Sequence, residues 1–208
     1  MRIVIGQPKM EKELKQLEEE LMAHPDADMF IFPEGYIHAN LEQACKLAGM
    51  HHTAIISGYK NPKDWAVIID ASGDILLNRA KYGEGSIAEV KGWRIAFLLC
   101  DELVLQGLGE QPESIDLIVH PIGVGMFSEE QFQEWIDLAK NIAKQHQAFM
   151  IGTSHADGSY RGAETSIPIA YCMNPQGEEI FIRKNDTRTI LLDTETMQIT
   201  AYEVAGWS

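Results

Sequence analysis

Hydrophobic residues in the first part of the chain alternate between short continuous runs and helical spacing. The runs at residues 2–6 and 29–32 are typical of buried strands, and Pro33 ends the second run. Between the runs, apolar residues recur at helical intervals with Glu and Lys between them: Met10, Leu14, Leu17 and Leu21. The pattern therefore predicts a strand, an amphipathic helix and a second strand.

The same alternation continues towards the middle of the chain. Leu41, Ala44, Cys45 and Ala48 predict a short helix, with Asn40 as its N-terminal cap. Strand-like runs follow at residues 53–58, 65–70, 75–79 and 93–99. The sequence Asp-Ala-Ser-Gly-Asp at residues 70–74 predicts a tight hairpin between the second and third of these strands.

The second half of the chain resembles the first in outline. A strand-like run at residues 115–120 is followed by Ser128 and Gln131, which form the capping box that opens a helix. The apolar face of this helix is Phe132, Trp135, Ile136, Ala139, Ile142 and Ala143. A strand at residues 148–153 and a hairpin at residues 174–177 complete the pattern.

Each half thus predicts a strand, a helix, a strand and a hairpin. This order favours an α/β protein with two packed sheets and helices outside them, a four-layer α-β-β-α sandwich. The chain has 208 residues, 45% of them hydrophobic, and contains no linker or low-complexity segment. We therefore expect one domain that spans residues 1–208.

Charge and composition narrow the classes of partner. The formal net charge is −14, from 31 acidic and 17 basic residues, so we expect no nucleic-acid partner and no anionic membrane partner. Residues 2–6 form too short a hydrophobic run for a signal peptide, and no apolar stretch approaches the length of a membrane span. We therefore expect a cytoplasmic protein.

The cysteines and histidines suggest neither a disulfide framework nor a metal site. The chain has three widely spaced cysteines, Cys45, Cys100 and Cys172, and only His51 and His52 are adjacent among its histidines. An odd number of cysteines without a Cys-x-x-Cys pair argues against both. We expect no metal and no cofactor.

Three residues of complementary chemistry follow strand-like runs: Glu34, Lys81 and Cys100. In α/β sheets, sites collect beyond the carboxyl ends of strands, so the three could meet. A carboxylate can activate a thiol, and an ammonium can stabilise the oxyanion that forms. The set would support acyl transfer from an amide-like carbon through a thioester. Taken alone, each residue favours a plainer reading, Cys100 as a small buried hydrophobe and Lys81 as an ordinary surface lysine.

The order of motifs resembles the nitrilase (carbon–nitrogen hydrolase) superfamily. The motifs are Phe32-Pro33-Glu34, the segment 73–81 that ends in Arg79-Ala80-Lys81, and Leu98-Leu99-Cys100-Asp101-Glu102. Further matches are residues 116–121, the helix with Trp135, and residues 174–178. They follow the family order over nearly the whole chain.

The resemblance implies an α-β-β-α fold, a homodimer and a small-molecule substrate such as an amide, carbamoyl or nitrile compound, with an amide as the default. It also assigns catalytic roles. Glu34 would be the base, Lys81 the oxyanion stabiliser and Cys100 the nucleophile, while the backbone N–H of Asp101 would be a second oxyanion donor. We expect Cys100 to form a thiolate more readily than Cys45 or Cys172.

Many family members have a second glutamate between the lysine and the cysteine. Glu84 and Glu89 are the candidates here, and we favour Glu84 as a catalytic residue. Tyr36 and His120 are predicted to bind substrate and Arg161 is a further pocket candidate, although a structural role is as compatible with each.

Two departures from the family pattern leave other functions open. The stretch from Lys81 to Cys100 is shorter than usual, and residues 103–105 read Leu-Val-Leu where the family has Arg-Phe-Pro-Glu. A binding or assembly protein that kept the fold without turnover is therefore an alternative. An unrelated isochorismatase-like cysteine hydrolase is a third hypothesis, against which Pro33-Glu34 and the order Glu–Lys–Cys argue.

Overall fold

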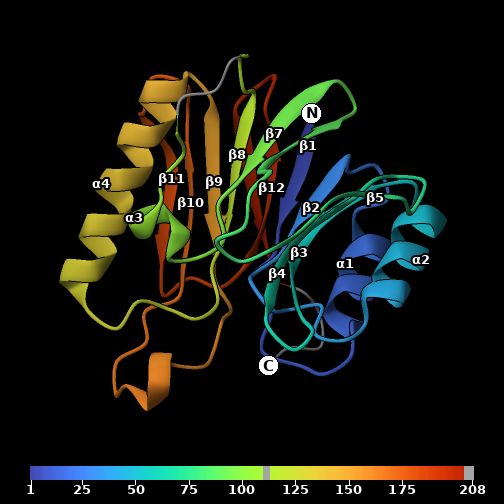
Figure 1. Cartoon of the computed structure of the whole chain (residues 1–208), viewed down its shortest axis with the longest axis horizontal. Coiled ribbons are helices and arrows are strands. Elements are labelled where there is room, and N and C mark those ends of the chain that lie inside the picture. The colour runs from blue at the N-terminus through green and yellow to red at the C-terminus, as the bar shows by residue number, and fades with distance from the viewer. Residues whose placement is uncertain (110–112, 204–208) are drawn as a thin grey trace.

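The computed structural model describes residues 1–109 and 113–203, which contain two β-sheets flanked by helices (Figure 1). The first sheet has the strand order β13-β12-β1-β2-β3-β4-β5. Its strands are β1 (Arg2–Ile5), β2 (Met29–Ile31), β3 (Ala54–Lys60), β4 (Asp64–Ile69), β5 (Ile75–Ala80), β12 (Thr189–Asp193) and β13 (Gln198–Tyr202).

The second sheet has the strand order β11-β10-β9-β8-β7-β6. Its strands are β6 (Ile87–Val90), β7 (Trp93–Phe97), β8 (Leu117–Pro121), β9 (Phe149–Thr153), β10 (Ile169–Met173) and β11 (Glu179–Lys184). The helices are α1 (Lys15–Ala23), α2 (Leu41–His51), α3 (Glu102–Leu105) and α4 (Glu129–His146), with a short 3₁₀ turn at Tyr160–Gly162.

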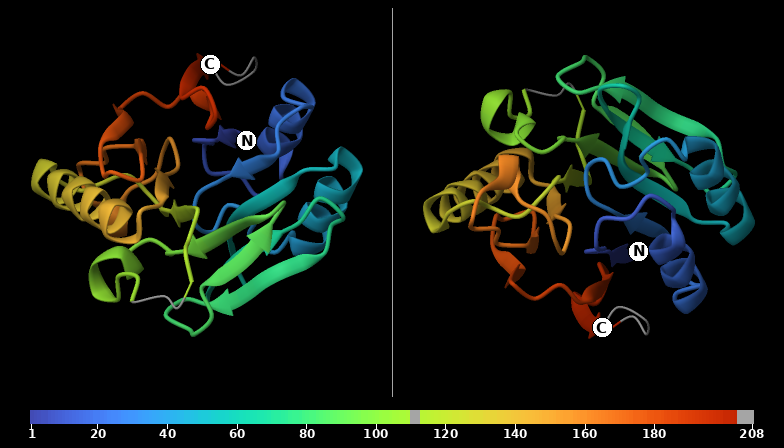
Figure 2. Two further views of the ribbon diagram at one scale, coloured as in Figure 1. Left: turned by 90° about the horizontal axis from the view of Figure 1, so that it is seen from above. Right: turned by 90° about the horizontal axis from the view of Figure 1, so that it is seen from below.

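The two sheets pack face to face, and their alternating side chains separate three hydrophobic clusters. In β1, Ile3 and Ile5 join the cluster between the sheets, whereas Val4 points to the opposite face and packs with α1 and α2. A third cluster fills the space between the second sheet, α3 and α4. The four-layer α-β-β-α sandwich is therefore confirmed, and the views in Figure 2 show the helices on the two outer faces.

Parallel strands form the centre of each sheet and bring their carboxyl ends to a common edge. In the first sheet β2 runs parallel to β1 and β3, and in the second β8 runs parallel to β7 and β9. The loops after β2 and β8 meet there, because the Glu34 N–H donates to the Ile122 carbonyl at 3.3 Å. The fold therefore gathers residues from both sheets at this edge.

The last two strands join the halves of the molecule in a way that the sequence pattern did not predict. After β11, the chain leaves the second sheet and returns to the first, where β12 pairs antiparallel with β1. Ile190 lies opposite Ile5 and Leu192 opposite Ile3, so both new residues enter the core between the sheets.

Two predicted helix starts need correction. The first helix begins at Lys15, so Met10 is half-exposed and precedes it, although Leu14 is buried as its spacing predicted. Side chains from elsewhere satisfy its N–H groups: Glu11 accepts from Gln16 and the Tyr36 hydroxyl accepts from Leu17. Asn40 precedes α2 but makes no capping bond, because its amide donates to the Lys12 carbonyl instead.

The remaining local signals behave as predicted. The Gly73 N–H donates to Asp70 and the Gly177 N–H donates to Asn174, which closes both predicted hairpin turns. The sequence analysis did not anticipate α3, nor β6 as a separate strand. Within the described ranges, no helix is long and apolar enough to cross a membrane.

The N-terminus of α4 gives a direct test of local capping. The Ser128 hydroxyl accepts from the Gln131 N–H at 3.1 Å, and the Gln131 side chain accepts from the Phe127 N–H at 2.9 Å. We expect Ser128→Ala to lower the free energy of unfolding by about 1 kcal/mol, because a helix N–H loses its acceptor. Urea denaturation measures the change. Asn40→Ala, which removes no capping bond, should cost less, and equal losses would contradict the assignment.

Candidate active site

Three chain segments deliver Glu34, Lys81 and Cys100 to the common edge of the sheets. Glu34 begins the loop after β2, where the Ser57 hydroxyl donates to the Pro33 carbonyl. Lys81 directly follows β5, and its N–H donates to the Asp64 carbonyl at 2.8 Å. Cys100 follows β7, and its N–H donates to the Pro121 carbonyl at 2.9 Å.

Cys100 has a left-handed backbone conformation, with φ of 53°. This conformation is uncommon for a residue with a side chain and must be held by its surroundings. His120 provides part of that hold, because its Nε2 lies 2.7 Å from the Cys100 carbonyl oxygen. Its Nδ1 lies 2.6 Å from the Tyr171 hydroxyl. Since the carbonyl can only accept, neutral His120 carries its proton on Nε2 and accepts from Tyr171 at Nδ1.

Lys81 lies between two carboxylates. Its Nζ is 2.8 Å from Oε1 of Glu34 and 2.8 Å from Oδ1 of Asp101. Burial alone would lower the pKa of Lys81, but the acidic groups of Cys100, Glu34 and Asp101 outweigh it and raise the pKa above its ordinary value. Lys81 is therefore a permanently charged ammonium.

The surroundings of Cys100 raise the pKa of its thiol, as burial also does for Cys45 and Cys172. Burial raises its pKa most, and the negative charge of Glu34 raises it further, whereas Lys81 and the Gly123 N–H act in the opposite direction. Burial also raises the pKa of the Glu34 carboxylate, and the Cys100 thiol acts in the opposite direction on it. The nucleophile and its base thus lie near each other and influence each other's protonation.

Gly123 packs against both reacting groups. A Cβ at this position would lie 2.9 Å from Oε2 of Glu34, which is too close for a carbon atom. Its N–H lowers the pKa of the Cys100 thiol, and its carbonyl contacts the buried ring of His155. A side chain at this position would displace the Glu34 carboxylate.

Glu102 and Arg79 form a buried ion pair behind the site, for which the sequence analysis assigned no role. The two terminal guanidinium nitrogens of Arg79, Nη1 and Nη2, lie 2.7 Å from the Glu102 carboxylate, which is fully buried. Glu102 also accepts from the N–H groups of Leu99 at 2.7 Å and Tyr82 at 2.6 Å. It thereby ties the residue before Cys100 to the residue after Lys81. The sequence signal that could have revealed this pair is the spacing of its members: Arg79 lies two positions before Lys81, and Glu102 lies two positions after Cys100.

Asp101 contributes more than the backbone group predicted for it. Its N–H donates to no backbone carbonyl in the described part of the chain, which is compatible with the oxyanion role predicted for it. In addition, its carboxylate accepts from the Tyr82 hydroxyl at 2.7 Å and contacts Lys81. The side chain therefore belongs to the cluster around Lys81, which the sequence analysis missed.

The structure does not bring Glu84 or Glu89 to the site. Glu84 is exposed in the turn after Lys81 and makes no hydrogen bond or ion pair with the chain that the structure describes. Gly83 and Gly85 let the chain turn outward there, with Gly85 at φ of 81°. Glu89 is exposed on β6, opposite Arg94 of β7. The second carboxylate at Lys81 is that of Asp101.

Tyr36 and His120 do not present free polar groups to the site. The hydroxyl of fully buried Tyr36 donates to Glu11 at 2.5 Å and accepts from the Leu17 N–H. Both ring nitrogens of His120 are occupied, as described above. Arg161 lies over the Tyr160 ring, 5.1 Å from its centroid. The contacts of Tyr36 and His120 indicate supporting roles rather than the predicted contact with substrate.

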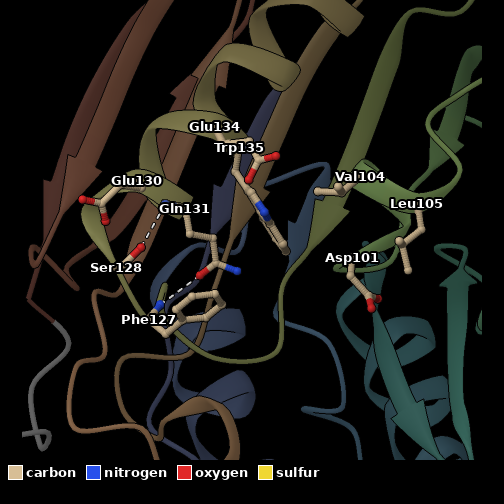
Figure 3. A pocket seen from close by; sticks show the side chains of 9 residues that line it. All are labelled: Asp101, Val104, Leu105, Phe127, Ser128, Glu130, Gln131, Glu134 and Trp135. Carbon is tan, nitrogen blue, oxygen red and sulfur yellow. Dashed lines mark hydrogen bonds between the residues drawn. The ribbon is translucent and has the colours of Figure 1, made fainter.

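A groove of about 600 Å³ opens beside Asp101, between α3 and α4 (Figure 3). In the figure, Val104 and Leu105 of α3 face Trp135 and Phe127 across it. Its lining is Asp101, Val104, Leu105, Phe127, Ser128, Glu130, Gln131, Glu134 and Trp135. Leu105 is 67% exposed and Phe127 45%, so the groove is an uncovered apolar surface next to the site.

The described residues form neither a disulfide nor a metal-binding cluster near the site. Cys45, Cys100 and Cys172 are all free. Among residues 1–109 and 113–203, no cluster of three or more His, Cys, Asp or Glu side chains could hold a metal ion.

Comparison with known proteins identifies the fold. The sequence matches no protein-family model and no curated protein. Solved structures do match: a carbon–nitrogen hydrolase from Helicobacter pylori has a TM-score of 0.73 at 14% identity, over 95% of this chain and 90% of that one. An amidase from Nesterenkonia sp. has a TM-score of 0.71 at 16% identity, over 93% and 89%.

A third similar structure is a CN-hydrolase superfamily protein from Xanthomonas campestris. It has a TM-score of 0.73 at 13% identity, over 95% of this chain and 92% of that one, and holds an arsenic adduct in its active site. The fold of this chain is therefore that of the nitrilase superfamily. The resemblance stated from the ordered sequence motifs is confirmed at the level of the fold.

The neutral state of His120 predicts a pH dependence of stability. Burial lowers the pKa of His120 to about 4, below the 6.5 of an ordinary histidine. Between these values the unfolded chain binds a proton that the folded chain does not, so this residue makes stability fall as the pH falls from 6.5 towards 4. We expect a contribution of roughly 1.4 kcal/mol per pH unit at its steepest.

Urea denaturation at several pH values measures this contribution as a difference between two proteins. His120→Gln keeps a donor for the Cys100 carbonyl but has no proton to gain. The free energy of unfolding should therefore fall less steeply with acidification in this variant than in the wild type. Parallel profiles would show that His120 is not held neutral by the fold.

Proposed function

We propose that the protein is a carbon–nitrogen hydrolase that cleaves a small amide or carbamoyl compound through a Cys100 thioester. The observation that carries the proposal is the convergence of Cys100, Glu34 and Lys81: the Lys81 ammonium donates to the Glu34 carboxylate at 2.8 Å, and both groups act on the pKa of the Cys100 thiol. Nucleophile, base and cation thus lie in one cluster.

The first half of the reaction acylates the cysteine. As the Cys100 sulfur attacks the substrate carbonyl carbon, Glu34 takes the thiol proton, so no free thiolate is needed beforehand. The carbonyl oxygen becomes an oxyanion, to which Lys81 and the Asp101 N–H can donate. Glu34 then returns its proton to the departing nitrogen, the C–N bond breaks, and ammonia or an amine leaves a thioester on Cys100.

The second half reverses these roles with water. Glu34 takes a proton from a water molecule as its oxygen attacks the thioester carbon, and the same donors stabilise the second oxyanion. When the C–S bond breaks, the proton returns from Glu34 to the sulfur and the acid product leaves. The cycle balances without a cofactor or a metal ion.

Two similar structures support an amide as the default substrate. One Nesterenkonia amidase structure contains acrylamide joined to its active-site cysteine by Michael addition, and another is a complex with butyramide. The three free cysteines of this chain agree with our proposal that the reaction takes place in the reducing cytoplasm.

An ammonia-release screen over small amides, carbamoyl compounds and nitriles tests the function. We expect turnover by the wild type and none by Cys100→Ala, which serves as the blank. Lys81→Met should lower kcat by about a hundred- to a thousandfold, because an oxyanion donor is lost. Glu34→Gln should lower kcat at least as far, because it removes the base.

The alternative function, binding or assembly without turnover, makes a different prediction for the same screen. Each protein would release ammonia at the rate of the Cys100→Ala blank. Thermal shifts with the same compounds would then show whether the wild type still binds any of them.

We also propose that two copies of the chain form a dimer through the groove between α3 and α4. Its exposed Leu105 and Phe127 form an apolar surface of the kind that a partner covers, and a two-fold dimer is the commonest assembly. Leu105→Glu should produce a monomer by light scattering, because two charges would meet across the two-fold axis. Met50→Glu, at a 72% exposed methionine of α2, is the matched control and should stay dimeric. A monomeric wild type would refute the proposal.

A further inference from the structure

The Asp101 carboxylate occupies a position from which it controls the direction of the Lys81 ammonium. An ammonium has three N–H donors. In the structure its Nζ donates to Glu34 at 2.8 Å and forms an ion pair with Oδ1 of Asp101, also at 2.8 Å. Contacts with two carboxylates restrict the direction of the ammonium and leave a donor for the substrate oxygen.

Glu34 cannot hold Lys81 throughout the proposed reaction. It accepts the Cys100 proton during attack, and while it is a carboxylic acid it no longer attracts the ammonium as an anion does. Asp101 takes no part in that proton transfer. Of the two carboxylates that contact Lys81 in the described part of the chain, it is therefore the one that keeps its charge while the oxyanion exists.

The surroundings of Asp101 suit this constant role. Its Oδ2 accepts from the Tyr82 hydroxyl at 2.7 Å, and the Tyr82 N–H is itself bound by the buried Glu102 carboxylate. The Asp101 side chain makes no capping bond to α3, so the helix does not compete for it. Burial works against ionisation, but the hydrogen bonds from Lys81 and Tyr82 prevail and lower the pKa of Asp101.

We propose that Asp101 is a positioning residue that holds Lys81 charged and oriented while Glu34 changes its protonation state. The inference rests on the proposed hydrolase function for its role in turnover. It goes beyond that function because it makes Asp101, the residue after the nucleophile, the second carboxylate of the site. The sequence resemblance had favoured Glu84 as that second acidic residue. The inference also gives the site two carboxylates for one ammonium, Glu34 and Asp101 against Lys81.

Two alkylating reagents of nearly equal size test the position of this charge without any substrate. Iodoacetamide is neutral, whereas iodoacetate is an anion that the Asp101 carboxylate should repel. In Asp101→Asn, we expect the ratio of iodoacetate to iodoacetamide rates at Cys100 to rise about three- to tenfold, as for a unit charge lost nearby. Mass spectrometry of the intact protein and its peptides gives both rates. A site that is merely loosened would speed both reagents equally and leave the ratio unchanged.

Steady-state kinetics test the positioning role with the compound that the ammonia-release screen identifies. Asp101→Asn should lower kcat on the order of tenfold or more and change KM little, because the loss is felt by the oxyanion. Asp101→Glu, which keeps the charge, should recover part of kcat. Glu84→Gln is the matched control, and both its reagent ratio and its kcat should equal those of the wild type.

The outcomes separate this inference from the function on which it rests. An Asp101→Asn protein with wild-type reagent ratio and wild-type kcat would overturn the inference, even if the wild type hydrolyses amides. A raised ratio in a protein that hydrolyses nothing would refute the hydrolase and uphold the charge beside Cys100. If Asp101→Asn has a lowered melting temperature, Tyr82→Phe provides the second test, since it removes only the hydroxyl that fixes Asp101. A wild-type kcat in Tyr82→Phe would then count against the inference.

Discussion

The candidate site depends on one buried carboxylate, that of Glu102, which ties the two sheets together where the reactive residues meet. It binds Arg79 of β5 and the Tyr82 N–H on one side, and the Leu99 N–H on the other. A buried ion pair is costly to desolvate, and here the Glu102 oxygens are satisfied by further hydrogen bonds from Leu99 and Tyr82. Losing one partner of such a pair typically costs about 3–5 kcal/mol, because the other charge is left unpaired. The separation of Lys81 and Cys100 is thereby set by a rigid contact.

Within that frame, the electrostatics favour a thiol that loses its proton only as it reacts. Burial and the neighbouring Glu34 both disfavour the thiolate, and Lys81 offsets them only in part. A cysteine paired with a histidinium can store its thiolate in the resting state. Here the base is the Glu34 carboxylate, which is itself an anion, so a Cys100 thiolate beside it is unfavourable. The proton must therefore move from Cys100 to Glu34 as the sulfur attacks. The neutral thiol and the permanent ammonium are two consequences of the same cluster of carboxylates.

The supporting residues show how the sandwich fixes a strained nucleophile. His120 and Tyr171 lie on neighbouring parts of the second sheet and end their hydrogen-bond chain at the Cys100 carbonyl. Gly123 removes the bulk that would separate Glu34 from Cys100. His120 and Tyr171 lie on β8 and β10, and Gly123 lies in the loop after β8. The second sheet therefore supports the nucleophile, whereas its base Glu34 and the cation Lys81 follow strands of the first sheet.

The sequence by itself determined the layers of the fold and the three residues at strand ends. Alternation at period two and spacing at helical intervals report which face is buried, and this local signal placed β1, β2 and α4 close to their observed bounds. Local signals also placed Glu34, Lys81 and Cys100 after strands, and the capping box at Ser128. They failed where an alternative local partner existed, as for Asn40, or where a helix was only one turn long, as for α3.

Only the tertiary structure decided the return of β12 to the first sheet and the identity of the second carboxylate at Lys81. Glu84 is three residues from Lys81 in sequence, yet the glycine-flanked turn directs it to solvent. Asp101 is twenty residues away and reaches Lys81 because Glu102 clamps the two loops together. Sequence periodicity encodes burial, which is local. Which distant side chains meet depends on sheet pairing and on long-range hydrogen bonds, and these exist only once both sheets have packed.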